Sequence, residues 1–156
     1  MFSSLKEIIY QGGILKFNIP KDWVEEYNDE DGGSFYEDSP TSGTLRVKLL
    51  TMESPKKLNS ENVKDILAPI NGEIKILPNK NAYKHYHKDT IESGHQITIF
   101  YWSLAQIIAP NNARLVNFSY TILSDKKELA SVKNEISFLT QQIQKASLSP
   151  ELTPYG

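Results

Sequence analysis

The chain has 156 residues, no cysteine and a formal net charge of −2. This is the length of one ordinary domain, which can bury enough apolar surface to fold without a metal or a disulfide. The lack of cysteine excludes thiolate catalysis, disulfides and cysteine-ligated zinc or iron–sulfur centres. The 17 basic and 19 acidic side chains are mixed along the sequence, without a basic stretch suited to nucleic acid or an apolar stretch suited to a membrane span. We therefore expect a cytoplasmic protein that binds neither nucleic acid nor a membrane.

The N-terminal region predicts short strands. Residues 14–19 alternate apolar and polar side chains, which is typical of a strand with one buried face. Residues 5–10 are compatible with a short helix or a short strand. Two more strands are predicted at 23–27 and 34–37, and the acidic, glycine-containing segment 28–33 between them predicts a hairpin turn.

A longer strand and a helix follow. Residues 44–52 alternate clearly, with Arg46 and Lys48 on the face that we expect to meet water. Asn59 is placed to cap a helix whose apolar stripe begins four residues later. Pro69 is expected to end this helix.

The centre of the sequence predicts a long hairpin. Residues 82–92 and 95–108 are rich in β-branched and aromatic side chains, which favour strands. Ser93 and Gly94 between them fit a two-residue hairpin turn. Residues 114–123 predict the last strand of the sheet.

The C-terminal region predicts a long amphipathic helix followed by a tail. Its apolar residues recur at helical spacing, at Leu129, Val132, Ile136, Leu139 and Ile143. Asp125 and Glu128 match the capping-box pattern at the start of such a helix. Residues 147–156 contain two prolines and no periodicity, so we expect a C-terminal tail there.

The order of these elements predicts an α+β fold. Most strands are joined by short polar turns, which parallel neighbours cannot use, so we expect an antiparallel sheet of about six to eight strands. The prediction is a single domain over residues 1–146, with the sheet flanked by the long C-terminal helix and one or two shorter helices.

Five short motifs follow one another in a characteristic order. They are Phe17-x-Ile19-Pro20-x-x-Trp23, Phe35-Tyr36-Glu37-Asp38, Gly43-Thr44-Leu45-Arg46-Val47, Tyr101-Trp102, and Val116 to Thr121 ahead of the last helix. This order resembles bacterial proteins of the PsbP-like α/β/α sandwich superfamily, over about residues 14–145. The resemblance implies a non-enzymatic binding or assembly domain whose partner differs from member to member. It carries over no functional residues, because the motifs are structural.

The strongest local signal for chemistry is the alternation of His85, His87 and Asp89. On a strand these side chains share one face, and two imidazoles with a carboxylate are a ligand set for iron or zinc. Same-face neighbours lie about 7 Å apart, however, so three in a row cannot enclose one ion. The hairpin register also sets Trp102 opposite His85 and Phe100 opposite His87, and neither supplies a ligand. We therefore expect no metal and no cofactor here.

The same strand face is a candidate partner-binding surface. If Trp102 were exposed beside Tyr83, His85 and His87, these side chains would form an aromatic patch of the kind that anchors protein interfaces. The simpler interpretation of Trp102 is a core residue. The sequence leaves both possibilities open.

The acidic turn is a second candidate surface. Aligning Gly32 with the sixth position of a calcium-binding loop puts Asp29 and Asp31 at the third and fifth. The first position would then be Tyr27 and the twelfth Asp38, and the flanking sequence predicts strands instead of helices. We therefore interpret the segment as a solvated hairpin turn, with Asp29 and Asp31 available to a partner.

These patterns favour a non-catalytic binding domain that recognises another protein, as an adaptor, chaperone or immunity-type protein. No nucleophile–base pair or convergent pair of carboxylates is apparent in the sequence. The alternative is a small-ligand or metal-binding enzyme that uses the His85/His87 face. We expect a monomer or a weak dimer formed through an edge strand.

Overall fold

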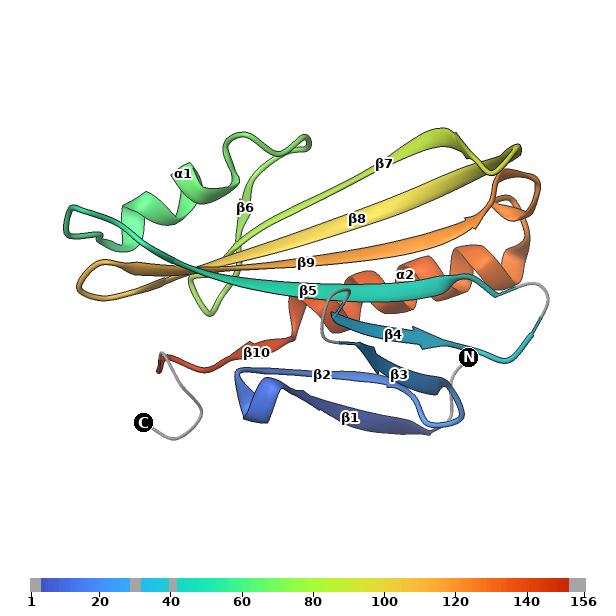
Figure 1. The fold of residues 1–156 in the computed structure, drawn as a ribbon, viewed down its shortest axis with the longest axis horizontal. Coiled ribbons are helices and arrows are strands. Elements are labelled where there is room, and N and C mark those ends of the chain that lie inside the picture. The colour runs from blue at the N-terminus through green and yellow to red at the C-terminus, as the bar shows by residue number, and fades with distance from the viewer. Residues whose placement is uncertain (1–3, 29–31, 40–41, 152–156) are drawn as a thin grey trace.

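The computed structural model describes residues 4–28, 32–39 and 42–151, which form two antiparallel sheets and two α-helices, an α+β fold (Figure 1). The larger sheet has seven strands, in the order β3 (Val24–Asn28), β4 (Gly32–Tyr36), β5 (Thr44–Glu53), β9 (Asn112–Leu123), β8 (His95–Ile108), β7 (Ala82–Glu92) and β6 (Lys75–Ile76). The smaller sheet has three strands, in the order β1 (Leu5–Tyr10), β2 (Leu15–Pro20) and β10 (Ser147–Leu148). The helices are α1 (Val63–Leu67) and α2 (Ala130–Gln144).

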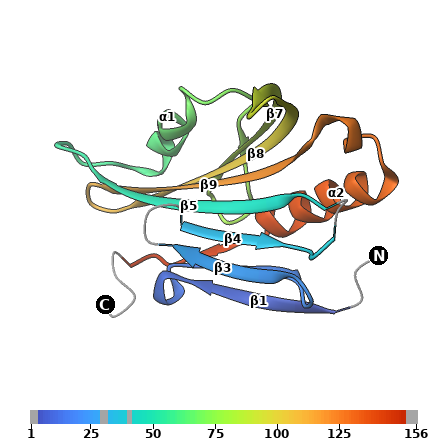
Figure 2. The same cartoon turned by 45° about the vertical axis from the view of Figure 1, so that its right-hand side comes forward.

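The two faces of the larger sheet are covered to different extents (Figures 1 and 2). Helix α2 and the smaller sheet pack on one face, which we call the covered face, and α1 packs on part of the other, the open face. The covered face carries the main core, including Leu45, Trp102, Phe118 and Tyr120. Phe17 of β2 joins this core, with its ring 5.3 Å from that of Phe118.

Helix α1 covers only one end of the open face. Its buried residues Val63 and Leu67 pack against Ala82 of β7 and Ala105 of β8. The two small alanine side chains allow the helix to lie close to the strands. Asn59, which the sequence predicted to cap the helix itself, caps the 3₁₀ turn Ser60–Asn62 that precedes it, accepting a hydrogen bond from the Glu61 amide at 2.9 Å.

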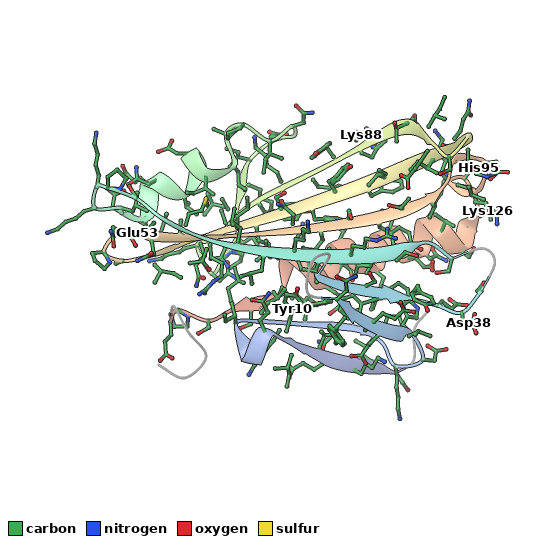
Figure 3. All side chains as sticks on the ribbon, viewed as in Figure 1. Tyr10, Asp38, Glu53, Lys88, His95 and Lys126 are labelled. Carbon is green, nitrogen blue, oxygen red and sulfur yellow. The ribbon has the colours of Figure 1, made fainter. Side chains whose placement is uncertain are left out.

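The predicted strands are confirmed, with small changes at their ends. Residues 5–10 form strand β1 and not a helix. The alternation of residues 44–52 is confirmed in β5, where Leu45 and Val47 are buried and Arg46 and Lys48 are exposed. Figure 3 shows β5 running the length of the molecule, from near Asp38 at one end to Glu53 at the other.

The register of the long hairpin is also confirmed. His85 pairs with Trp102 and His87 with Phe100. Ser93 and Gly94 both have positive φ, +52° and +80°, as a two-residue turn between twisted antiparallel strands requires.

The prediction of a long C-terminal helix is wrong, because α2 has only 15 residues. Residues Ser124–Lys126 form a separate 3₁₀ turn, and the helix starts after Leu129, which is extended and makes no side-chain cap. The predicted capping box does not form, since Glu128 pairs with Lys133 at 2.8 Å instead. Leu129 is consequently 42% exposed and lies outside the buried stripe.

The segment expected to be a tail makes ordered contacts in its described part. Ser147 and Leu148 form β10 beside β2. The Arg114 guanidinium donates hydrogen bonds to the carbonyl oxygens of Ser149, at 2.7 Å, and Glu151, at 2.8 Å. Residues 147–151 therefore pack against the covered face. A two-residue strand is too short to produce a visible alternation in the sequence.

Candidate functional site

The predicted aromatic patch lies on the covered face, beneath α2. Trp102 is fully buried, and its indole N–H donates a hydrogen bond to the Thr140 hydroxyl of α2 at 3.0 Å. Tyr83 is 6% exposed. Of the two interpretations left open for Trp102, the core residue is the one observed, and neither side chain is accessible to a partner in this structure.

The two histidines of the same face differ in environment. The His85 ring stacks on Trp102, with centroids 4.9 Å apart. Its Nδ1 lies 2.8 Å from the Tyr101 carbonyl oxygen and must carry the proton, because a carbonyl only accepts. Burial lowers the pKa of this imidazole below its ordinary value. His87 is exposed and borders a hollow of ≈ 420 Å³ together with Phe100.

Two of the predicted metal-ligand candidates, His85 and Asp89, already have other partners. The Asp89 carboxylate accepts a hydrogen bond from the Thr98 hydroxyl at 2.5 Å and pairs with Lys127 at 3.5 Å. Within the described residues, no three histidine, aspartate or glutamate side chains come together as metal ligands do. His85, His87 and Asp89 thus share one face of β7, but they do not converge on one point as metal ligands do.

Asp29 and Asp31, the candidates in the acidic turn, lie outside the described residues. The strands on either side are described, and Asn28 pairs with Gly32 across the β3–β4 hairpin. The flanking elements are therefore strands, as predicted, and not the helices of a helix–loop–helix calcium site.

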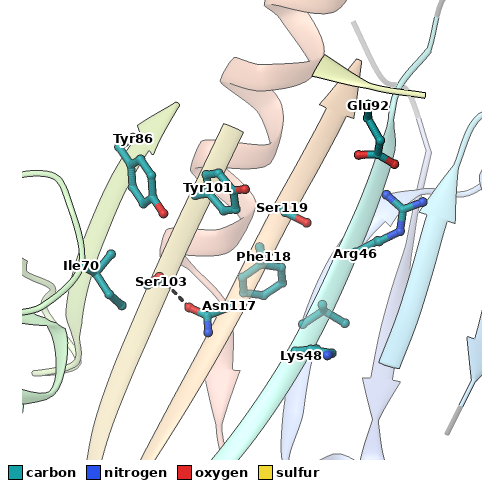
Figure 4. A pocket seen from close by; sticks show the side chains of 11 residues that line it. Arg46, Lys48, Ile70, Tyr86, Glu92, Tyr101, Ser103, Asn117, Phe118 and Ser119 are labelled. Carbon is teal, nitrogen blue, oxygen red and sulfur yellow. Dashed lines mark hydrogen bonds between the residues drawn. The ribbon is translucent and has the colours of Figure 1, made fainter. Parts of the chain in front are cut away.

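The sequence did not predict a hollow of ≈ 630 Å³ on the open face (Figure 4). It lies over the middle of four strands, β7, β8, β9 and β5. Its lining includes Tyr86, Tyr101, Ser119, Arg46 and Lys48. We call it the open-face hollow.

The strand register builds this hollow in two rows. Each residue of the first row pairs with the next across the sheet: Tyr86, Tyr101, Ser119 and Arg46. The second row, one step along the strands on the same face, is Lys84, Ser103, Asn117 and Lys48. Because paired residues of adjacent strands point to the same side, all eight side chains face away from α2.

An aromatic pair forms one side of the hollow. The rings of Tyr86 and Tyr101 stack with centroids 4.7 Å apart and planes inclined by 16°. The Lys88 ammonium lies 5.5 Å from the Tyr101 ring centroid, a cation–π contact. The pair therefore forms an aromatic cluster on which the Lys88 ammonium lies over the Tyr101 ring.

The loop after α1 closes one edge of the hollow. The buried Lys84 ammonium donates a hydrogen bond to the Ile70 carbonyl, which ties this loop to β7. The loop passes so close to β7 that a Cβ on Gly72 would lie 2.8 Å from the His85 carbonyl oxygen, and the φ of Gly72 is +107°. Only glycine fits this position without strain.

Positive charge predominates around the hollow. Arg46, Lys48 and Lys88 are exposed. Glu92 is the one acidic residue among the described residues of the lining, and Figure 4 shows its carboxylate above the Arg46 guanidinium. At the centre, the Ser103 hydroxyl donates to the Asn117 side-chain oxygen at 2.7 Å.

The side chains that line the hollow include groups suited to binding by contact. Among the described residues of the lining, the serines have no histidine beside them. Aromatic rings, hydroxyl and amide groups and exposed cations are instead the groups that recognise a partner. Neither described helix has the length and apolar character that crossing a membrane requires.

Part of this site could have been found in the sequence. Arg46 and Lys48 were correctly assigned to the wet face of their strand. The confirmed hairpin register also sets Tyr86 opposite Tyr101. What the sequence did not indicate was which face of the hairpin α2 covers.

No protein-family model matches the sequence, and neither does any curated protein. The fold itself is shared with solved structures. A protein of Bacteroides thetaiotaomicron superposes with a TM-score of 0.63 and 17% identity, over 92% of this chain and 48% of the other. The present chain thus spans about half of the length of that protein.

Two further structures cover most of both chains. LpqN of Mycobacterium tuberculosis, described as involved in cell envelope biogenesis, gives a TM-score of 0.60 and 11% identity over 87% of this chain and 83% of its own. The Ran-binding protein Mog1p of Saccharomyces cerevisiae gives a TM-score of 0.52 and 11% identity over 93% of this chain and 95% of its own. At these identities the similarity shows a common fold alone.

Proposed function

We propose that this chain is a non-catalytic binding domain that recognises another protein through the open-face hollow. The observation that carries the proposal is the uncovered middle of the open face, where a stacked tyrosine pair lies beside exposed cations. Tyrosine and arginine are enriched among the residues that dominate the free energy of protein interfaces. An adaptor, chaperone or immunity-type protein would use such a face.

The fold similarity supports a binding role in general terms. Mog1p is a Ran-binding protein, and the proposal extends protein binding, not the particular partner, to this chain. We also propose that the chain belongs to the PsbP-like α/β/α sandwich superfamily. The support for this is the order of the sequence motifs and the presence of helices over both faces of the sheet.

We further propose a bacterial, cytoplasmic protein that is a monomer or a weak dimer. The absence of cysteine supports the location. The edge strand β3 exposes Glu25 and Glu26, and charges on an edge strand oppose pairing with a second copy. Light scattering of the purified chain tests the oligomeric state.

The test of the proposed function fills the hollow without disturbing the fold. Ser119→Tyr places a bulky, strand-favouring side chain between Tyr101 and Arg46. Ser131→Tyr is the matched control, because Ser131 is exposed on α2 and serine and tyrosine have similar helix propensities. Thermal unfolding of both variants checks that each is folded.

Affinity capture from the cells that produce the protein then compares the two variants with the wild type. We expect a protein that the wild type and Ser131→Tyr both retain and that Ser119→Tyr loses. Identical sets of captured proteins for all three would contradict the use of the open face.

The alternative is a small-ligand site beside His87. It is favoured by the ≈ 420 Å³ hollow between β8 and α2, which Phe100 and Ile136 line with apolar surface. His87→Ala would then abolish ligand binding and leave partner capture intact. Metal analysis of the purified protein tests the metal-dependent form of this alternative.

A further inference from the structure

We infer that the segment recognised by the open-face hollow is an acidic polypeptide, bound with its carboxylates on Arg46 and Lys48 and an aromatic or apolar side chain on the Tyr86/Tyr101 pair. This inference rests on the proposed function and specifies the chemistry of the partner.

Arg46 and Lys48 are placed to meet an anionic partner, with Glu92 at the rim as a local competitor. Arg46 and Lys48 are exposed on the same face of β5, two residues and therefore about 7 Å apart. The ion pairs formed within the described residues lie elsewhere, at Lys6–Glu25, Lys127–Asp89 and Lys133–Glu128. An arginine guanidinium binds a carboxylate with two parallel hydrogen bonds, and a lysine ammonium adds a second positive charge beside it.

The polar groups between the cations and the tyrosines suit a peptide backbone. Ser119 lies between Tyr101 and Arg46 in the first row, and Asn117 lies beside Lys48 in the second. Asn117 is exposed, and its side-chain amide can donate while its oxygen accepts from Ser103. These groups can bond the carbonyl and amide groups of a chain that crosses the strands.

The dimensions of the hollow fit a short segment of chain. The first row crosses four adjacent strands, so Tyr86 lies three inter-strand steps from Arg46, or about 14 Å, and Tyr101 lies two steps away. About four or five extended residues span this distance. A small ligand would instead be expected in an enclosed pocket that buries most of its surface, whereas this hollow is spread across the exposed middle of a sheet.

The charge pattern favours an acidic protein segment over nucleic acid. Three exposed cations with Glu92 beside them form a local cluster and not a stripe. Nucleic-acid binding uses many phosphate contacts along a basic face, and the whole chain carries a net charge of −2. Carboxylates spaced along a short segment match the observed cations better.

The inference is tested with a soluble random copolymer of glutamate and tyrosine as the probe. The folded, isotope-labelled full chain is titrated, and the backbone amide shifts are mapped by NMR. A copolymer of lysine and tyrosine and an oligothymidylate are titrated in parallel. We expect shifts confined to β5, β7, β8 and β9 around the hollow with the acidic copolymer, and weaker binding of the other two.

A charge-matched pair of variants makes this test specific. Arg46→Gln with Lys48→Gln removes two charges from the hollow, and Lys56→Gln with Lys57→Gln removes two exposed charges from a distant loop. We expect about tenfold weaker binding of the acidic copolymer to the first variant and no more than twofold to the second. Equal binding to the two variants, tighter binding of the oligothymidylate, or shifts that map away from the hollow would overturn the inference.

Partner capture separates the failure of this inference from the failure of the proposed function. A partner lost with Ser119→Tyr but kept with Arg46→Gln/Lys48→Gln at all salt concentrations refutes the acidic segment and leaves protein binding at the open face. A partner kept with both variants refutes both statements.

Discussion

The two arginines of the sequence lie on opposite faces of the same sheet, and their surroundings show how the two faces differ. Arg114, on the covered face, is fully buried and donates to backbone carbonyl oxygens of the C-terminal segment. Arg46, on the open face, is exposed and lines the open-face hollow. An arginine side chain thus stabilises the fold on the covered face, at Arg114, and is available to a partner on the open face, at Arg46.

This contrast extends along neighbouring positions of β8. Trp102 faces α2 and is fully buried, whereas Tyr101 faces the hollow and is partly exposed. Strand geometry sends successive side chains to opposite faces. Residues adjacent in sequence therefore contribute to stability and to recognition separately, and substitutions can test each contribution.

The largest expected difference is between truncations at these two adjacent positions. Trp102→Ala removes a buried indole that packs in the core and bonds Thr140, so we expect a loss of about 3–5 kcal/mol in the free energy of unfolding. Tyr101→Ala should cost about 1 kcal/mol or less, the usual scale for one cross-strand aromatic pair. Urea unfolding monitored by circular dichroism measures both values.

Trp102→Phe is the control for a Trp102→Ala variant that fails to fold, because it keeps much of the packing and loses the hydrogen bond. Its loss in the free energy of unfolding should lie between those of Trp102→Ala and Tyr101→Ala. Similar losses for the alanine variants at positions 101 and 102 would contradict the assignment of the two faces.

The next largest difference in stability is expected between substitutions of the two arginines. Arg114→Met leaves the carbonyl groups of Ser149 and Glu151 without their donor, and we expect a loss of about 3 kcal/mol in the free energy of unfolding. Arg46→Met should change it by less than about 0.5 kcal/mol, as is usual for exposed positions. Chemical denaturation compares the two variants.

Hydrogen exchange gives a second measurement for the same pair of variants. If Arg114 holds the C-terminal segment, the amide of Leu148 should exchange faster in Arg114→Met and at the wild-type rate in Arg46→Met. Unchanged exchange in Arg114→Met would show that β10 is held by its pairing with β2 alone.

A smaller effect is expected at Glu135, a buried carboxyl on the stripe of α2 that packs against the covered face. It accepts hydrogen bonds from Tyr120, at 2.5 Å, and Ser42, and burial, with a further contribution from the charge of Glu37, raises its pKa above the ordinary 4.5. Between pH 4.5 and the higher folded-state pKa, the unfolded chain has released this proton while the folded chain still holds it. The stabilising contribution of Glu135 is therefore present below that pH and is lost as the pH rises through the folded-state pKa.

Glu135→Gln keeps an acceptor for Tyr120 and removes the charge. We expect the variant to gain on the order of 1 kcal/mol in unfolding free energy over the wild type at neutral pH, and no gain in acid. Denaturation curves from about pH 4 to about pH 8 measure the difference. Glu73→Gln, at an exposed position, serves as the control. A constant difference between Glu135→Gln and the wild type at all pH values would contradict the raised pKa.

The sequence predicted the α+β class, the strands and the hairpin register, because these follow from alternation and turn chemistry. It could not decide which face of the hairpin is covered, since both faces of β7 carry aromatic and basic side chains. Tyr83 and His85 alternate with Lys84 and Tyr86, and either pair could have faced α2. The candidate patch was therefore assigned to residues that the structure places in or beside the core.

Two other features of the structure differ from the sequence-based predictions for similar physical reasons. Glu135 reads as a polar position of the helix, yet it is 4% exposed, because Tyr120 and Ser42 supply its donors from β9 and the segment before β5. These partners are far away in sequence. The length of α2 was overestimated because a 3₁₀ turn and a helix share the same local preferences up to Leu129.

The smallest expected effect concerns Glu92, the acidic residue that lies over Arg46 at the rim of the hollow. Its charge occupies the region where we place the carboxylates of the partner, so it should compete with them. We expect Glu92→Gln to bind the copolymer of glutamate and tyrosine about two- to threefold more tightly, the scale of one exposed charge interaction. Glu53→Gln is the control. It makes the same change in net charge at the last residue of β5, where Glu53 is exposed (Figure 3). An equal gain in both variants would mean that net charge, and not the position of Glu92 in the hollow, controls the affinity.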